Sequence, residues 1–340
     1  MGGHSLRHVR CGMDAAHGVH MSLKYTLSNS KPHLPLKLDT HSGLTFLQRG
    51  WLSSNNVLLQ DSQQAILIDS GYWTHSAQTL ELVRACLGSQ PLTRLLNTHL
   101  HSDHCGGNAA LQSAFPALEC RVPPGHANFV FDWDPAALTY TPTGQHCPPF
   151  TPHGVILPGE RFTVALQEWE ALAAPGHDPH SVIFYCEETG VLISADALWE
   201  NGFGVVFPEI EGIGAFDDVQ NTLDLIESLQ VTHVIPGHGD MFQDMALALR
   251  HARSRLASFR SDPRKHASYA AKVLVKFKLL ELQRIELESF RQWAHACDYL
   301  RTLQERYAAH QTFTAWLDDV LVSLEKSAAA KINGSEVLNV

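Results

Sequence analysis

The sequence predicts an α+β fold with a C-terminal helical extension, and two patterns in its 340 residues support this prediction. Between residues 44 and 240, short apolar runs end in turn-forming or polar residues, which is typical of buried strands. Longer segments with the composition of helices separate some of these runs. Beyond residue 240, good helix formers dominate the chain.

The first expected elements are two paired strands around 57–59 and 65–68, where apolar residues gather. A helix over 76–86 should follow and end at Gly88 and Pro91, because both residues disfavour continuation of a helix. The remaining elements of this part are strands over 93–98, 162–166, 169–173, 182–185, 191–194 and 231–235, and helices over 107–115 and 217–229.

The segment 123–158 differs in composition from the rest of the chain. Its eight prolines are Pro123, Pro124, Pro135, Pro142, Pro148, Pro149, Pro152 and Pro158, and they alternate with aromatic residues. Proline is excluded from helix interiors and central strands. Because long ordered loops in compact domains are usually functional, we expect this segment to form a wall or lid of a pocket. A solvated connector is the alternative.

We expect a helical region over 241–330, followed by a tail over 331–340. The helices should cover 241–259, 268–283, 289–309 and 312–326, and Asp262 with Pro263 is a suitable helix start. Apolar residues such as Val273 and Phe277 recur near helical spacing, so this helix should pack on another surface. We expect the helices to cover the mouth of the functional site, with a dimer interface as the alternative.

The charge of this region differs from that of the whole chain. Residues 250–310 carry 13 Lys and Arg against 6 Asp and Glu, a net charge of +7, whereas the chain as a whole carries −10. A basic module on an acidic chain attracts anionic substrates. Lys272 and Lys276, four residues apart, would lie together and face such a substrate. A solvated helical face is the alternative.

The segment 98–104 is the strongest functional signal in the sequence. It places three histidines and one aspartate within six residues, His99 to His104. Imidazole and carboxylate are the ligands that borderline divalent metals prefer. If the strand stays extended, His99 and His101 point to the same side. The following Gly106 and Gly107 would allow a turn that returns Asp103 and His104 to the same centre.

Four further polar residues each follow a predicted strand or a Pro-Gly turn. They are Asp69, His177, Asp196 and His238. Polar groups just past strand ends lie at the rim of a sheet, where functional sites are built. Each one alone has an ordinary structural explanation, such as a helix cap or a loop residue. Their order along the chain is the informative feature.

In that order, these motifs resemble the metallo-β-lactamase superfamily. The resemblance covers residues 44–240, and the HxHxDH signature that begins at His99 is specific to it. It implies a four-layer αββα sandwich over 25–240, with a two-metal site at one edge. Within the superfamily, the motifs THLHSDHCGG and PGHG are most similar to those of the glyoxalase II-like and LACTB2-like hydrolases.

The resemblance also implies roles for the individual residues. The first metal would be bound by His99, His101 and His177, and the second by Asp103, His104 and His238. Asp196 would bridge the two metals, and Asp69 would support a ligand from behind rather than bind metal. Zn²⁺ is the expected metal, with Fe or Mn as alternatives.

This ligand set predicts a binuclear metal-dependent hydrolase. Two divalent ions about 3.5–4 Å apart share a bridging hydroxide near neutral pH, and this hydroxide attacks an electrophilic centre. Asp103 would act as the catalytic proton acceptor. The expected reaction is the cleavage of an ester, thioester, lactone or phosphoester in a small molecule.

Three other functions stay open at this point. A LACTB2-like endoribonuclease is favoured by the basic C-terminal region and disfavoured by the acidic chain, so nucleic acid is not the expected partner. A mononuclear iron persulfide dioxygenase shares much of the ligand set. A non-catalytic binding protein is the third, and the seven filled ligand positions argue against it.

Composition predicts a cytoplasmic protein without membrane association. No apolar stretch approaches the roughly 20 residues of a membrane helix, and residues 1–24 read as an extension without fixed structure rather than as a signal peptide. The seven cysteines are scattered and odd in number, which favours reduced thiols. Cys105 directly follows His104, and we expect it to be a buried packing residue.

Overall fold

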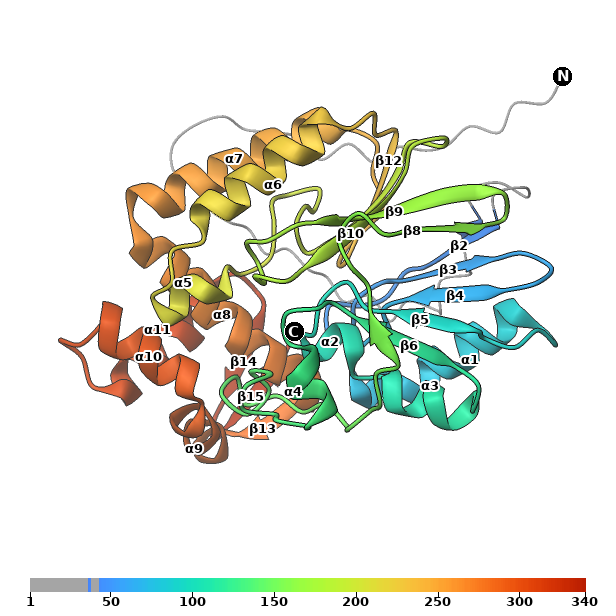
Figure 1. Ribbon diagram of the computed structural model, residues 1–340. Helices are drawn as coiled ribbons and strands as arrows, with labels where there is room; N and C mark the ends of the chain where they lie inside the picture. The colour runs from blue at the N-terminus through green and yellow to red at the C-terminus, as the bar shows by residue number, and fades with distance from the viewer. Residues whose placement is uncertain (1–35, 38–42) are drawn as a thin grey trace, which may run out of the picture.

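Two β-sheets face each other, and helices cover their outer surfaces, in a computed structural model that describes residues 36–37 and 43–340 (Figure 1). The layers are therefore helix, sheet, sheet and helix, as predicted, and further helices from the C-terminal part pack at one end. The expected N-terminal extension, residues 1–24, lies outside the described residues. None of the described helices is both long and apolar enough to cross a membrane.

The first sheet has seven strands in the order β1-β2-β3-β4-β5-β6-β7. They span Leu36–Lys37, Leu44–Leu47, Asn56–Gln60, Ala65–Ile68, Arg94–Leu96, Glu119–Val122 and Gly154–Val155. The pairs from β1 to β4 are antiparallel, and the pairs from β4 to β7 are parallel. The parallel pairing of β4 and β5 places their carboxyl ends at the same edge.

The second sheet has five strands in the order β12-β11-β10-β9-β8. They span His233–Pro236, Val191–Ala195, Val182–Cys186, Gln167–Ala173 and Arg161–Val164. Only β11 and β12 pair in parallel, and the other pairs are antiparallel. Because β10 and β11 are buried along their whole length, they read as unbroken apolar runs in the sequence.

Of the four hydrophobic clusters among the described residues, three hold the layers together. The central one joins the inner faces of the two sheets and includes Trp169 and Phe184, which are fully buried. A second joins the first sheet to helices α1, α3 and α4, which span Ser76–Leu87, Asn108–Ala114 and Ala127–Phe131. The third joins the second sheet to α5, α6 and α7, which span Phe207–Glu211, Phe216–Ser228 and Met245–Ser261, and continues into the C-terminal helices.

The C-terminal helices are α8, α9, α10 and α11, which span Pro263–Leu282, Leu287–Ala296, Asp298–Tyr307 and Phe313–Lys326. As expected, α8 begins at Pro263, and the Asp262 side chain accepts a hydrogen bond from the Arg264 backbone N–H. The single helix predicted over 289–309 is instead two helices. The carbonyl oxygen of Pro142, from the Pro-rich segment, accepts a hydrogen bond from the Tyr299 N–H at the start of α10.

Two further expectations need correction. Residues 331–340 are not a loose tail, because β14 (Ala330–Asn333) and β15 (Glu336–Asn339) form a hairpin that pairs with β13 (Arg284–Glu286). The segment 123–158 is also not entirely loop, since it contains the short helix α4 and the edge strand β7. The helix α4 and the strand β7 are too short for a periodic pattern to be visible in the sequence.

Candidate metal centre

The predicted site residues converge at the edge where the two sheets meet. Asp69 follows β4, and His99 follows β5 in the first sheet, while Asp196 follows β11 and His238 follows β12 in the second. Each sheet therefore contributes the carboxyl ends of a parallel strand pair, which is where open sheets build sites. The loop after β9 supplies His177.

The first group of converging atoms consists of three imidazole nitrogens, from His99, His101 and His177. His101 Nδ1 lies 2.8 Å from His177 Nε2, and His177 Nε2 lies 3.3 Å from His99 Nε2. Two nitrogens that share a tetrahedral Zn²⁺ at its usual bond length are about 3.3 Å apart. The spacing of these three nitrogens therefore fits a metal ion.

The second group combines Asp103, His104 and His238. His238 Nε2 lies 3.1 Å from Asp103 Oδ2. His104 Nε2 is fully buried and has no hydrogen-bond partner among the described residues. A buried imidazole nitrogen without a partner is costly unless a ligand satisfies it, and a cation at this position would do so.

Asp196 lies between the two groups. Its Oδ2 is 3.4 Å from His177 Nε2, and its Oδ1 is 3.5 Å from His104 Nε2. One carboxylate thus presents one oxygen to each group. Trp199 Nε1 donates a hydrogen bond to Oδ1, 3.2 Å away, and this bond orients the carboxylate.

Groups behind the ligands determine which ring nitrogen of each histidine carries its proton. The Val205 carbonyl accepts only, so His177 must be protonated at Nδ1, 2.5 Å away, and its Nε2 is left with a lone pair. In the same way Asp69 Oδ2 lies 2.8 Å from His104 Nδ1 and directs the Nε2 lone pair of His104 into the site. Asp69 also accepts from the Thr98 backbone and hydroxyl.

Burial and mutual repulsion suppress protonation at the first group. Burial, followed by the nearby histidines, lowers the pKa of His99 well below its usual range, and burial with His177 lowers the pKa of His101 to about 4. For Asp196, burial alone would raise the pKa, but the neighbouring His238 and His104 outweigh it and lower the pKa well below the usual value. At His99 and His101 the neutral imidazole, which is the form that binds metal, is therefore favoured.

The glycines near these ligands are required for close packing. Gly106 and Gly107 form a turn, as expected, but this turn does not position Asp103 and His104, which already lie on the preceding one-turn helix α2 (Ser102–Cys105). A Cβ on Gly107 would instead come within 2.5 Å of the Ser70 carbonyl oxygen. A Cβ on Gly237 would come within 2.1 Å of Asp196 Oδ1, so only glycine fits beside this carboxylate.

A cavity of about 80 Å³ opens onto both groups. The segment 123–158 contributes Thr139, Thr143 and Gln145 to its lining, which places part of that segment in the wall, as predicted. The helix α8 contributes Val273, Leu274 and Phe277. Of the C-terminal helices, α8 therefore reaches the site, as predicted for the group.

The expected role of the α8 lysines is wrong for Lys276. Its Nζ turns away from the cavity and donates to the Ala329 carbonyl and to Asn339 Oδ1, each at 2.6 Å. Neither Lys272 nor Lys276 lines the cavity. The sequence showed only their four-residue spacing, and the hairpin that binds Lys276 was not predicted.

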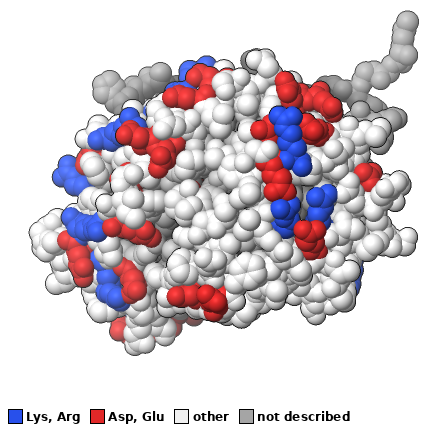
Figure 2. All heavy atoms as spheres, in the orientation of Figure 1, with Lys and Arg blue, Asp and Glu red and all other residues white. Residues whose placement is uncertain are grey.

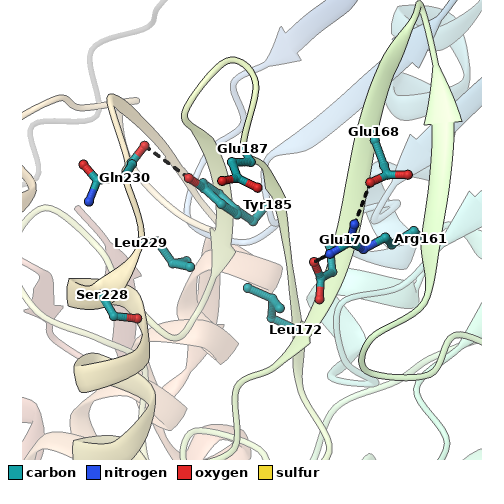
Figure 3. Close-up of a pocket in the computed structure, with 9 residues that line it drawn as sticks. All are labelled: Arg161, Glu168, Glu170, Leu172, Tyr185, Glu187, Ser228, Leu229 and Gln230. Carbon is teal, nitrogen blue, oxygen red and sulfur yellow. Dashed lines mark hydrogen bonds and ion pairs between the residues drawn. The ribbon is translucent and has the colours of Figure 1, made fainter.

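A larger hollow of about 310 Å³ lies on the second sheet, away from these ligands (Figure 3). Arg161 pairs there with Glu168 and Glu170 at 2.8 Å, and Tyr185 donates to the Gln230 carbonyl. None of the candidate metal-binding groups among the described residues lies in it. We therefore assign the chemistry to the smaller cavity.

Sequence reasoning missed Trp51 and Trp199. The Trp51 ring stacks on the His238 ring with centroids 5.4 Å apart, and Trp199 packs edge-on against Trp51. Trp199 lies three residues after Asp196 in the sequence. This spacing indicates that the two residues are close, but not that the Trp199 side chain points toward Asp196. Cys105 is buried, as expected, and its thiol lies 3.1 Å from the Tyr140 hydroxyl.

Comparison with known families agrees with this geometry. The family model described as Metallo-beta-lactamase superfamily matches residues 49–238, more than half of the chain. A metallo-beta-lactamase family protein from Thermus thermophilus shares the fold, with a TM-score of 0.52 and 21% identity over 88% of this chain and 99% of that one.

Two curated relatives are named as a hydrolase and as a thioesterase. The hydroxyacylglutathione hydrolase of Xanthomonas campestris pv. campestris is 31% identical over 44% of this chain and 48% of its own length. The acyl-coenzyme A thioesterase MBLAC2 of Gallus gallus is 25% identical over 59% of this chain and 79% of its own length. The chain spans about half the length of several curated relatives that it matches.

Proposed function

The chain belongs to the metallo-beta-lactamase superfamily, and from that membership we propose that it hydrolyses thioesters with two bound divalent metal ions. The observation that carries this proposal is the position of Asp196, which turns one oxygen to each of two ligand groups. The thioester as substrate class rests on the relatives that are named as a hydroxyacylglutathione hydrolase and as an acyl-coenzyme A thioesterase.

The first ion would be held by His99, His101 and His177, and the second by Asp103, His104 and His238, with Asp196 shared. Zn²⁺ suits a ligand set of imidazoles and carboxylates. When bound, the two ions would lower the pKa of a water molecule and polarise the thioester carbonyl.

The protein's own groups then position and move protons. Asp69 and the Val205 carbonyl keep His104 and His177 protonated at Nδ1, so both Nε2 lone pairs stay available. Asp103 borders the cavity, and its carboxylate accepts the proton of the attacking water. As the C–S bond breaks, Asp103 returns this proton to the thiolate, which leaves as the thiol.

An endoribonuclease has less support. A phosphodiester backbone is normally held by Lys and Arg, and the described residues that line the cavity include neither. No feature of the site favours the dioxygenase or the non-catalytic alternative over the hydrolase.

Metal analysis and thioester turnover of the purified protein test the proposal together. We expect about two divalent ions per chain and hydrolysis that a chelator abolishes. His101→Ala and Asp103→Ala should each lower kcat/KM at least 100-fold, while His310→Ala, at an exposed position outside the site, leaves it unchanged. Saturation at one ion per chain, or full turnover in Asp103→Ala, would contradict the mechanism.

A further inference from the structure

The cavity beside the metal ligands has one wall made only of apolar side chains. The helix α8 presents Val273, Leu274 and Phe277 to it, and Trp51 and Phe207 are further apolar residues of the cavity lining. The segment 123–158 lines the same cavity with the polar residues Thr139, Thr143 and Gln145, which form its polar wall. A substrate that lies across the ligands therefore meets two surfaces of opposite character.

The apolar wall is held rigidly against the metal-binding domain. The Phe277 ring packs edge-on against the Tyr72 ring, with centroids 5.0 Å apart. Tyr72 is fully buried, and its hydroxyl donates to Glu281 Oε1 on the same helix, 3.0 Å away. Because Tyr72 lies only three residues after Asp69, this contact couples the position of α8 to the strand that ends at the site.

The side chains of Lys276 and Lys278, on α8, bind other parts of the protein and do not line this cavity. Lys276 is bonded to the C-terminal hairpin, and Lys278 pairs with Glu281 and lies 5.2 Å from the Trp293 ring centroid. No Lys or Arg occurs among the described lining residues. On the face shown in Figure 2, blue side chains gather over the C-terminal helices and near β8 and β9, and few charges lie between. A carboxylate on the acyl group would find no cationic side chain here.

We propose that the α8 wall is an acyl-binding pocket, and that the substrate is a thioester with an uncharged, apolar acyl group. Phe277, as the bulkiest α8 residue in the lining, limits the length of the acyl chain that fits. The polar wall receives the thiol portion. This inference rests on the proposed thioester hydrolysis and specifies its substrate class.

Acyl thioesters of N-acetylcysteamine, from two to twelve carbons, provide the first test. Each buried methylene should raise kcat/KM about fourfold until the pocket is full. A glutaryl thioester, which carries a carboxylate, should react at least tenfold more slowly than the pentanoyl thioester. A flat chain-length profile, or a preference for glutaryl, would overturn the inference.

Substitutions on α8 test where the acyl-binding pocket lies. Phe277→Ala should shift the optimum to acyl chains at least two carbons longer, whereas Leu282→Ala, on the exposed end of the same helix, should leave the optimum unchanged. If Phe277→Ala fails to fold, Phe277→Leu provides a smaller truncation with the same expected direction. An unchanged optimum in a folded Phe277 variant would refute the role of this residue.

A binding measurement separates this inference from the proposed function. S-alkyl thioethers of N-acetylcysteamine lack the scissile carbonyl, and calorimetry of the metal-loaded protein should show affinity that rises with alkyl length. If no thioester is hydrolysed but this trend appears, the proposed function fails and the pocket stands. If thioethers bind without dependence on alkyl length, the pocket is refuted.

Discussion

Asp69 and His104 form a fully enclosed contact in which the carboxylate Oδ2 lies 2.8 Å from the imidazole Nδ1. Asp69 adopts a left-handed backbone conformation, with φ of 57°, immediately after β4. Aspartate tolerates this conformation better than most residues. The end of β4 thus directs the Asp69 carboxylate toward helix α2, where it orients His104.

Asp69→Asn tests this orienting role while keeping the shape of the side chain. If the amide oxygen accepts from the Thr98 N–H, its NH₂ group must face His104 Nδ1 and favour the tautomer protonated at Nε2. That tautomer cannot bind metal through Nε2. We expect metal affinity to fall about 10–100-fold in a chelator competition. The exposed Asp132→Asn serves as control, and equal affinity in both variants would contradict the tautomer argument.

Gly237→Ala tests the space beside the bridging carboxylate. The Gly237 backbone is fixed by hydrogen bonds to Ala195 and Asn55, both 2.7 Å long, so it cannot move away. Its new Cβ would lie 2.1 Å from Asp196 Oδ1. We expect loss of bound metal and of thioester turnover in a folded protein. Gly50→Ala, where nothing lies within 4 Å of the added Cβ, should behave as the parent.

Asp196→Asn tests the bridge itself. An amide offers one acceptor oxygen in place of two and carries no charge, so it cannot serve two cations equally. Metal analysis should find no more than one ion per chain, and kcat/KM should fall at least 100-fold. The surface variant Asp224→Asn is the control. Retention of two ions in Asp196→Asn would show that this residue is not shared.

His266 predicts a pH dependence of folding stability that is independent of the metal ligands. Its Nε2 accepts a hydrogen bond from the Val206 N–H at 3.1 Å, and burial lowers its pKa to about 4. The unfolded chain, with a pKa near 6.5 at this residue, binds the proton first as pH falls. Stability is therefore retained above about pH 6.5 and lost as pH falls towards 4.

The loss attributable to this residue between pH 7 and pH 5 is about 2 kcal/mol. His266→Gln keeps an acceptor for Val206 but does not titrate. Urea unfolding at both pH values should therefore show a loss that is smaller by about this amount in the variant, at equal metal content. Identical losses in the two proteins would rule out the titration of His266 as the cause.

Much of the site was predictable because its residues stand at fixed positions relative to strands. The run from His99 to His104 concentrates ligands within one segment, and Asp196 and His238 each follow an unbroken apolar run. The αββα order of elements is likewise visible in runs of buried residues. Local sequence encodes these features, since burial and turn chemistry act over a few residues.

Features that depend on contacts between distant segments were not predictable. The break between α9 and α10 coincides with a hydrogen bond to Pro142, 157 positions before Tyr299 in the chain. Gly107 was correctly singled out for the wrong reason, because the carbonyl that approaches it belongs to Ser70, on another loop.

The sequence by itself indicated which residues gather at the site and the helical character of the C-terminal region. Only the tertiary structure decided that Asp196 turns one oxygen to each group, that α8 faces the cavity with Phe277, and that Lys276 turns away. Amphipathic spacing predicts that a helix has an apolar face. The surface that this face covers depends on how the whole chain packs.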